Sequence, residues 1–159
     1  MELCLGTVQF GMDYGINGKK KPTIKECVNC MDYAVCHGIK SIDTAAAYGN
    51  AEEVVGVFLK RKTVSREKLW ISSKLMPNIL DNVSPNRYKE TIRNELTKSL
   101  TKLGTEYLDA YYFHSSRYSF NDEIALSSPC AIALSTSLLS DDIPESANNP
   151  ERLFNISSI

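Results

Sequence analysis

The sequence predicts an α/β fold with a parallel sheet, and two observations support this prediction. Between residues 1 and 114, short apolar or β-branched runs alternate with stretches whose apolar residues recur at helical spacing. Strands that are joined by single helices must run parallel, and such crossovers are right-handed almost without exception. Residues 1–114 therefore describe four consecutive βα-type units.

The first unit pairs a short apolar run with a helix whose two ends are marked. Residues 3–5 are the predicted strand, and a Gly-rich loop follows them. Thr23 and Glu26 form a capping box that opens the helix. Gly38 is a typical residue for the end of that helix.

The second and third units follow the same pattern. Residues 40–42 form a predicted strand that ends at Asp43. Asn50 and Glu53 then predict the N-cap and third position of a helix. Residues 69–74 form the third predicted strand.

The fourth unit begins with Ser84 as the N-cap of a helix and Pro85 at its first position. Gly104 ends that helix, and residues 107–114 form a strand that is strongly β in composition. Residues 115–159 are rich in serine, and their apolar residues follow neither helical nor strand periodicity. We expect this divergent tail to be poorly ordered or loosely packed.

The composition argues against several classes of protein. A net charge of −1 gives no electrostatic reason to expect a nucleic-acid or membrane partner. There is no leader and no long apolar span, so we expect a soluble, cytoplasmic protein. The five cysteines are odd in number and irregularly placed, which suits reduced thiols. Cys27 and Cys30 lack a second pair, and we expect core cysteines and no metal.

Three of the predicted strands end in an ionisable residue. Asp43 ends the second strand, Lys74 the third and His114 the fourth, and Tyr48 lies in the loop five residues after Asp43. Barrels of eight βα units keep their active sites at the carboxyl ends of the strands. This placement therefore favours a partial (β/α)8 barrel over a doubly wound sheet.

These four residue types suit the reduction of a carbonyl, in which hydride reaches carbon while the oxygen takes a proton. A phenol with an ordinary pKa of about 10 is a sluggish acid near neutrality. A neighbouring ammonium favours the phenolate and strengthens the acid, and a carboxylate fixes that ammonium. A neutral imidazole can hydrogen-bond the substrate oxygen. Tyr48, Lys74, Asp43 and His114 supply these parts.

Each residue also has a simpler explanation when it is taken alone. Asp43 could cap a helix, Tyr48 could be an apolar anchor with a wet hydroxyl, and Lys74 could be a solvated strand end. Taken alone, His114 is explained about equally well as a site residue and as a core histidine whose imidazole is hydrogen-bonded. Their joint occurrence favours a site, whereas Asp109, within the fourth strand, is assigned to structure.

Several motifs, in the right order, closely resemble the aldo-keto reductase family. They are LGTVQFG at residues 5–11, residues 38–50 followed by AEEVVG at 51–56, ISSK at 71–74, and residues 99–114. Together they span most of residues 3–114. The resemblance implies an NADPH-dependent oxidoreductase that reduces an aldehyde or ketone on a (β/α)8 barrel.

The resemblance also implies a role for each site residue. Tyr48 would be the general acid, Lys74 and Asp43 would tune it, and His114 would orient the carbonyl. Implied cofactor contacts are Asp43, Gly6 and Thr7, with Asp43 reaching the nicotinamide ribose.

The quoted motifs end at His114, whereas a complete barrel of this type needs about 250 residues. In the family, the second half supplies the groups for the carboxamide, the ring and the adenosine phosphate of the cofactor. We therefore expect a truncated reductase with little activity alone. The alternatives, in order, are two copies that pair through exposed barrel edges and a non-catalytic interaction module. The expected partner is a small carbonyl substrate, which the sequence does not specify.

Overall fold

The computed structural model describes residues 3–15 and 20–115 of the chain. The elements are β1 (Cys4–Gly6), α1 (Val8–Gly11), α2 (Ile24–Cys36), β2 (Ser41–Asp43), α3 (Ala51–Lys60), the 3₁₀ turn η1 (Arg66–Lys68), β3 (Trp70–Lys74), the 3₁₀ turn η2 (Pro85–Arg87), α4 (Tyr88–Leu103) and β4 (Ala110–Tyr112). The predicted tail from residue 116 onward lies outside the described residues.

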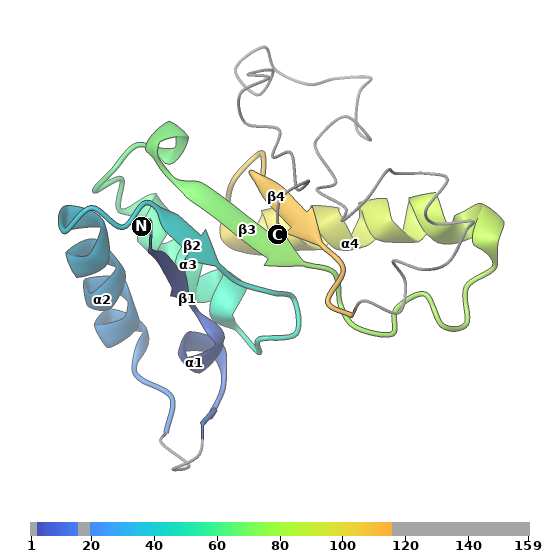
Figure 1. Cartoon of the computed structure of the whole chain (residues 1–159), viewed down its shortest axis with the longest axis horizontal. Helices are drawn as coiled ribbons and strands as arrows, with labels where there is room; N and C mark the ends of the chain where they lie inside the picture. Colours follow the sequence, from blue (N-terminus) through green and yellow to red (C-terminus); the bar gives the residue numbers. More distant parts are fainter. Residues whose placement is uncertain (1–2, 16–19, 116–159) are drawn as a thin grey trace.

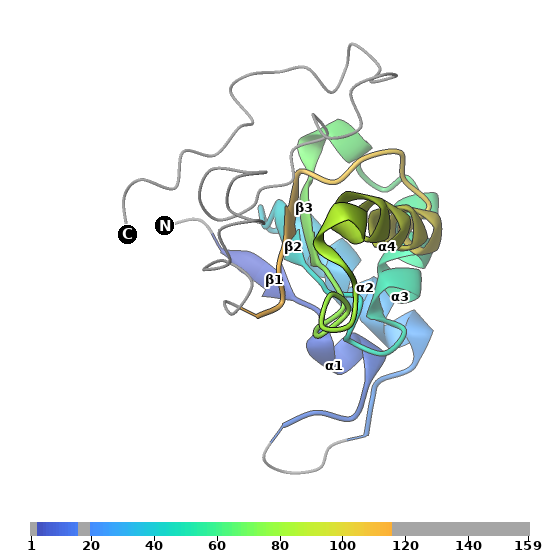
Figure 2. The same ribbon diagram turned by 90° about the vertical axis from the view of Figure 1, so that its right-hand side faces the viewer.

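The four strands form one parallel sheet in chain order, as the alternation of strands and helices predicts. Helices α2, α3 and α4 all lie on one face of this sheet (Figures 1 and 2). The register pairs Asp43 with Ser72 and Lys74 with Tyr112. Because side chains alternate along a strand, these four residues share the face opposite the helices, here called the inner face.

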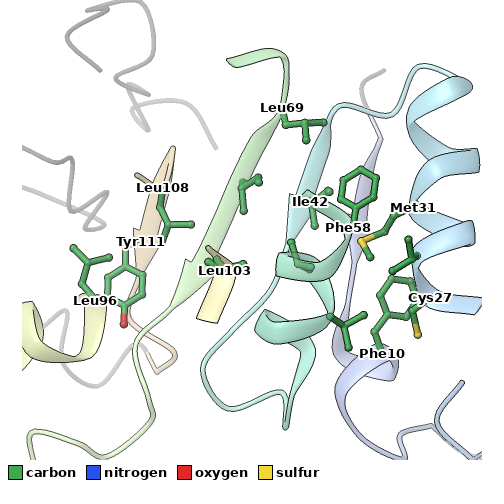
Figure 3. Close-up of a cluster of buried hydrophobic side chains, with 14 of the residues drawn as sticks. Phe10, Cys27, Met31, Ile42, Phe58, Leu69, Leu96, Leu103, Leu108 and Tyr111 are labelled. Carbon is green, nitrogen blue, oxygen red and sulfur yellow. The ribbon is translucent and has the colours of Figure 1, made fainter. Parts of the chain in front are cut away.

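The helix-facing side of the sheet buries the core. Ile42 and Ile71 are almost completely buried there, in one cluster with Met31 of α2 and Phe58 of α3 (Figure 3). Burying one such side chain contributes roughly 1.5–3 kcal/mol of transfer free energy. No helix within the described residues is long and apolar enough to cross a membrane.

Local signals at the helix ends are confirmed in two places. The Thr23 hydroxyl accepts the Glu26 amide at 3.3 Å, and the Glu26 carboxylate accepts the Thr23 amide at 2.8 Å, which completes the predicted capping box. Gly104 follows α4 in the left-handed conformation (φ 63°), which stops the helix at little steric cost.

Other local predictions were wrong in part. Asn50 precedes α3, but its side chain makes no capping hydrogen bond and instead accepts the Lys21 ammonium at 2.6 Å. Ser84 precedes the 3₁₀ turn η2 rather than α4, and its side chain does not cap. The short helix α1 forms within the segment predicted as a Gly-rich loop.

Strand β4 is much shorter than the predicted strand at residues 107–114. The segment before it is used in polar contacts with Arg66, whose guanidinium donates to the Tyr107 carbonyl at 3.0 Å. The same guanidinium pairs with the Asp109 carboxylate at 2.7 Å, and this carboxylate also accepts the Ile71 amide at 2.8 Å. The Asp109 side chain is only 1% exposed, so these contacts give it the structural role predicted for it.

We expect Arg66→Leu to lower the free energy of unfolding by about 3–5 kcal/mol, because it takes the guanidinium away from a buried carboxylate. The matched control is Arg61→Leu, which breaks the exposed pair with Asp32 and should cost no more than about 1 kcal/mol. Urea denaturation measures both changes. Equal losses in the two variants would contradict this account of the Asp109 site.

Candidate active site

The four predicted site residues meet at the carboxyl edge of the sheet. Asp43 is the last residue of β2 and Lys74 is the last residue of β3. Tyr48 lies in the loop between β2 and α3, and His114 lies two residues beyond β4. The order of strands in the sheet thus brings together residues that are far apart in the sequence.

The closest contact in the site is the ion pair between Lys74 and Asp43. The ammonium lies 2.7 Å from one carboxylate oxygen and 2.6 Å from the other, and it also donates to the Thr44 carbonyl at 3.1 Å. The Ser72 hydroxyl donates to the same carboxylate at 3.0 Å. The side chains of Lys74 and Asp43 are 21% and 31% exposed, so the pair is fixed in place yet still open to a ligand.

The Tyr48 phenol contacts the same ammonium. Its hydroxyl is 3.5 Å from Lys74 Nζ, and Nζ lies 5.1 Å from the centre of the ring. This is a long hydrogen bond, of the kind that tightens when a ligand completes a site. The Lys74 ammonium therefore contacts both a carboxylate and a phenol.

His114 contacts the phenol through its ring. The two ring centres are 5.9 Å apart and the planes meet at 80°, an edge-to-face arrangement. No hydrogen bond to a described residue occupies the imidazole nitrogens, which suits a group that orients a substrate oxygen. Asp43, Tyr48, Lys74 and His114 thus form one cluster.

Two glycines that the sequence reasoning missed hold the Tyr48 loop against α1. A Cβ at Gly11 would lie 1.6 Å from the Tyr48 carbonyl oxygen, and a Cβ at Gly49 would lie 2.2 Å from the Gly11 carbonyl oxygen. Gly49 also has a positive φ of 57°, which favours glycine. The signal was the recurrence of glycine in both motifs, but their close approach is a tertiary contact.

The two other predicted cofactor residues differ in exposure. Thr7 is fully buried, and both its amide and its hydroxyl donate to the Asp43 carbonyl at 3.0 Å. It therefore holds the end of β2, while its contact with a cofactor stays a prediction. Gly6 is exposed, and apart from its chain neighbours no described residue has an atom within 4 Å of the position that a Cβ would take. Its missing side chain leaves open space next to Asp43, its partner in the register.

The charges of Asp43 and Lys74 affect the pKa of two further residues, Cys4 and Tyr112. Burial raises the pKa of the Cys4 thiol, the Asp43 carboxylate raises it further, and Lys74 opposes them. Burial also raises the pKa of Tyr112, Asp43 raises it further, Lys74 lowers it, and Cys4 raises it. No group of three or more metal-ligating side chains occurs among residues 3–15 and 20–115.

Cys4 can therefore report on the charges of the site without any ligand. We expect Asp43→Asn to lower the pKa of the Cys4 thiol and to speed its alkylation at about pH 8, because a negative charge near the thiolate is lost. Lys74→Met should raise that pKa further and slow the reaction. Peptide mass spectrometry measures the rates, with the exposed Cys36 as an internal control. Changes of the opposite sign, or equal changes at Cys36, would contradict this geometry.

Sequence comparison relates the chain to known reductases. The model of the aldo/keto reductase family matches residues 2–139, beyond residue 114 where the quoted motifs end. The chain is 38% identical over 119 residues to the NAD/NADP-dependent indole-3-acetaldehyde reductase of Schizosaccharomyces pombe, a match that covers 74% of the chain and 38% of that protein. It is 41% identical over 90 residues to the methylglyoxal reductase DkgA of Escherichia coli, covering 57% and 29%. The chain thus spans well under half the length of these relatives.

Solved structures agree with this relationship. A Bombyx mori aldo-keto reductase in complex with NADP superposes with a TM-score of 0.54 and 30% identity, covering 70% of the chain and 33% of that structure. The thermostable aldo-keto reductase Tm1743, in complex with the inhibitor epalrestat, gives 0.59 and 29%, covering 78% and 42%. These similarities confirm the prediction that the fold is part of a (β/α)8 barrel. The chain belongs to the aldo/keto reductase family.

Proposed function

We propose that the chain is an NADPH-dependent oxidoreductase that reduces an aldehyde or ketone. One observation carries the proposal: the Lys74 ammonium contacts both the Asp43 carboxylate and the Tyr48 hydroxyl, and the His114 ring packs against the Tyr48 ring. The bound nicotinamide supplies the hydride. The four side chains perform the proton transfer and position the carbonyl.

Tyr48 is the acid in this proposal. As charge develops on the carbonyl oxygen, the phenol gives up its proton and the nearby Lys74 ammonium stabilises the phenolate that is left. Asp43 keeps Lys74 in place through both carboxylate oxygens. His114 donates a hydrogen bond to the substrate oxygen and so aims the carbonyl at the phenol. Solvent returns the proton to Tyr48 after the alcohol leaves.

The inner face fits the ribose end of a nicotinamide cofactor. Asp43 offers a partly exposed carboxylate that can accept ribose hydroxyls, and the open space at Gly6 leaves room beside it. The S. pombe relative is named as NAD/NADP-dependent and the B. mori structure holds NADP, which supports NADPH here. We expect weak affinity, because the described residues contribute only this part of the cofactor's surface.

The substrate in this proposal is a small carbonyl compound. Two relatives are named for reducing indole-3-acetaldehyde and methylglyoxal, which are both small and reactive.

The chain also carries four free cysteines among its described residues, which supports a reducing, cytoplasmic location.

The edges of the sheet favour a second candidate, a homodimer formed through β1 and β4. Within the described residues each of these strands has a sheet neighbour on one side only. Leu3, next to β1, is 61% exposed. Open strand edges pair readily with another chain, and two copies related by a two-fold axis could join β1 of one to β4 of the other.

Tyr48→Phe tests the proposed chemistry. We expect it to lower turnover of a reactive aldehyde by at least about a hundredfold, because it removes the acid, and to leave NADPH affinity within about twofold. NADPH fluorescence measures binding, and its oxidation measures turnover. Tyr33→Phe, at an exposed tyrosine of α2, is the matched control and should change neither. Wild-type turnover by Tyr48→Phe would show that Tyr48 is not the general acid.

Light scattering on the purified chain tests the homodimer. We expect a mass of twice 17.7 kDa at micromolar concentration, and a Leu3→Lys change beside the β1 edge should shift it toward the monomer. A monomer at every concentration would exclude this assembly. That result would leave the proposed chemistry of a single chain intact.

A further inference from the structure

We propose that a buried hydrogen bond between Glu52 and Ser73 sets the separation of Tyr48 and Lys74, so that Glu52 and Ser73 are positioning residues. This inference rests on the reaction proposed above, but the geometric part of it does not. Neither side chain is part of the four-residue cluster. Both side chains lie on the helix-facing side of the sheet, whereas the cluster lies on the inner face.

The chain places each partner next to a site residue. Ser73 directly precedes Lys74 in β3, and its side chain points toward the helices because Lys74 points to the inner face. Glu52 lies in the first turn of α3, four residues after Tyr48. A bond between the two side chains therefore ties the start of α3 to the end of β3.

The contact is short and excludes water. The Ser73 hydroxyl donates to a Glu52 carboxylate oxygen at 2.7 Å, and the two residues are 0% and 2% exposed. A buried carboxylate is costly unless it is hydrogen-bonded, and a bond to a charged acceptor is among the stronger kinds. Lys102 of α4 lies 3.8 Å from the second carboxylate oxygen, which has no hydrogen bond among the described residues. Ser73 is thus the one hydrogen-bond donor to Glu52 within that part of the chain.

This bond completes the attachment to β3 of the loop that carries Tyr48. Before Tyr48, the Ala46 amide donates to the Lys74 carbonyl at 3.1 Å. After it, Glu52 binds Ser73, and the Ala51 amide donates to the Tyr48 carbonyl at 3.0 Å. The Thr44 amide also donates to the Ser72 carbonyl at 2.9 Å, so the loop is held to three consecutive residues of β3, and the Glu52–Ser73 bond is the attachment that follows Tyr48. Without the Glu52–Ser73 bond, the hydrogen bonds from this loop to β3 within the described residues, apart from that of the Tyr48 hydroxyl, would all precede Tyr48, and the part of the loop after Tyr48 would be held against α1, where the Asn50 amide donates to the Gly11 carbonyl at 3.4 Å.

Removing the hydroxyl with Ser73→Ala tests the inference. We expect kcat to fall about tenfold or more while NADPH affinity and the KM for the aldehyde stay within about twofold, because misplacement of reacting groups by about 1 Å can cost up to a hundredfold. Glu52→Gln keeps an acceptor oxygen for Ser73 and should retain most of kcat, whereas Glu52→Met should behave like Ser73→Ala. Thermal unfolding of each variant shows that the protein assayed is folded.

Ser99→Ala is the matched control. Ser99 is a buried serine of α4, only 1% exposed, and its loss should leave kcat unchanged. A role in stability alone would lower the unfolding temperature of Ser73→Ala without changing the kcat of the folded protein. That outcome, or a Glu52→Gln variant as impaired as Glu52→Met, would overturn the inference.

Crystal structures of the unliganded full chain separate this inference from the proposed function. If the wild-type chain neither binds NADPH nor reduces an aldehyde, the proposed function fails and the geometry is still decided. We expect the distance from Tyr48 Oη to Lys74 Nζ, 3.5 Å in the wild type, to lengthen by about 1 Å in Ser73→Ala and to stay unchanged in Ser99→Ala. An unchanged distance in Ser73→Ala would overturn the positioning role.

Discussion

The parallel register between β2 and β3 is the constraint on which the site depends. It sets Asp43 opposite Ser72, so that Lys74, two residues further on, lies on the same face and one step beyond. The carboxylate then reaches the ammonium diagonally across the two strands, and the Ser72 hydroxyl supports it from the directly paired position. A slip of one residue would turn the Lys74 side chain toward the helices and would separate the pair. The apolar residues Ile42 and Ile71 oppose such a slip, since it would also move the core to the wrong face.

Two ion pairs at opposite ends of β3 show how burial separates a structural role from a chemical one. Arg66 and Asp109 lie near its amino end, where Asp109 is almost fully buried and also accepts a backbone amide. Its contacts with Arg66 and with the Ile71 amide stabilise the path of the chain into β4. Lys74 and Asp43 lie at the carboxyl end and keep part of their surface exposed. That exposure is what allows a charged pair to act on a ligand.

Residues on the inner face and the helix α1 both position the Tyr48 loop. On the inner face, Tyr48 contacts Lys74 and His114. Beside the loop, Gly11 of α1 packs directly against the loop backbone, which requires the absence of a Cβ there. The phenol is thus positioned by elements that take no part in the proposed proton transfer. The same division explains why Glu52, a buried acid, lies behind the site and not in it.

The parts of this molecule that sequence reasoning predicted are those with local signals. The alternation of short apolar or β-branched runs with helical stretches predicted the four strands, and the spacing from Thr23 to Glu26 predicted a capping box that the structure contains. The strand-end positions of Asp43 and Lys74 were also sufficient to predict that they meet, because parallel strands present their carboxyl ends at one edge. The side chain of Asn50 was assigned wrongly because Lys21, distant in sequence, competes for it. The Glu52–Ser73 bond and the approach of Gly11 to Gly49 depend on how helices pack on the sheet, which no local pattern encodes.

In the proposed reaction, the Asp43–Lys74–Tyr48 arrangement transfers a proton to a carbonyl as hydride arrives. The most direct measurement uses NADPH deuterated at C4 of the nicotinamide and a reactive aldehyde, with mass spectrometry of the alcohol. We expect deuterium on the carbinol carbon with the wild-type chain and none above background with a Lys74→Met, Tyr48→Phe double variant that remains folded. Equal incorporation by the double variant, or none by a folded wild-type chain saturated with cofactor, would contradict the proposed reaction.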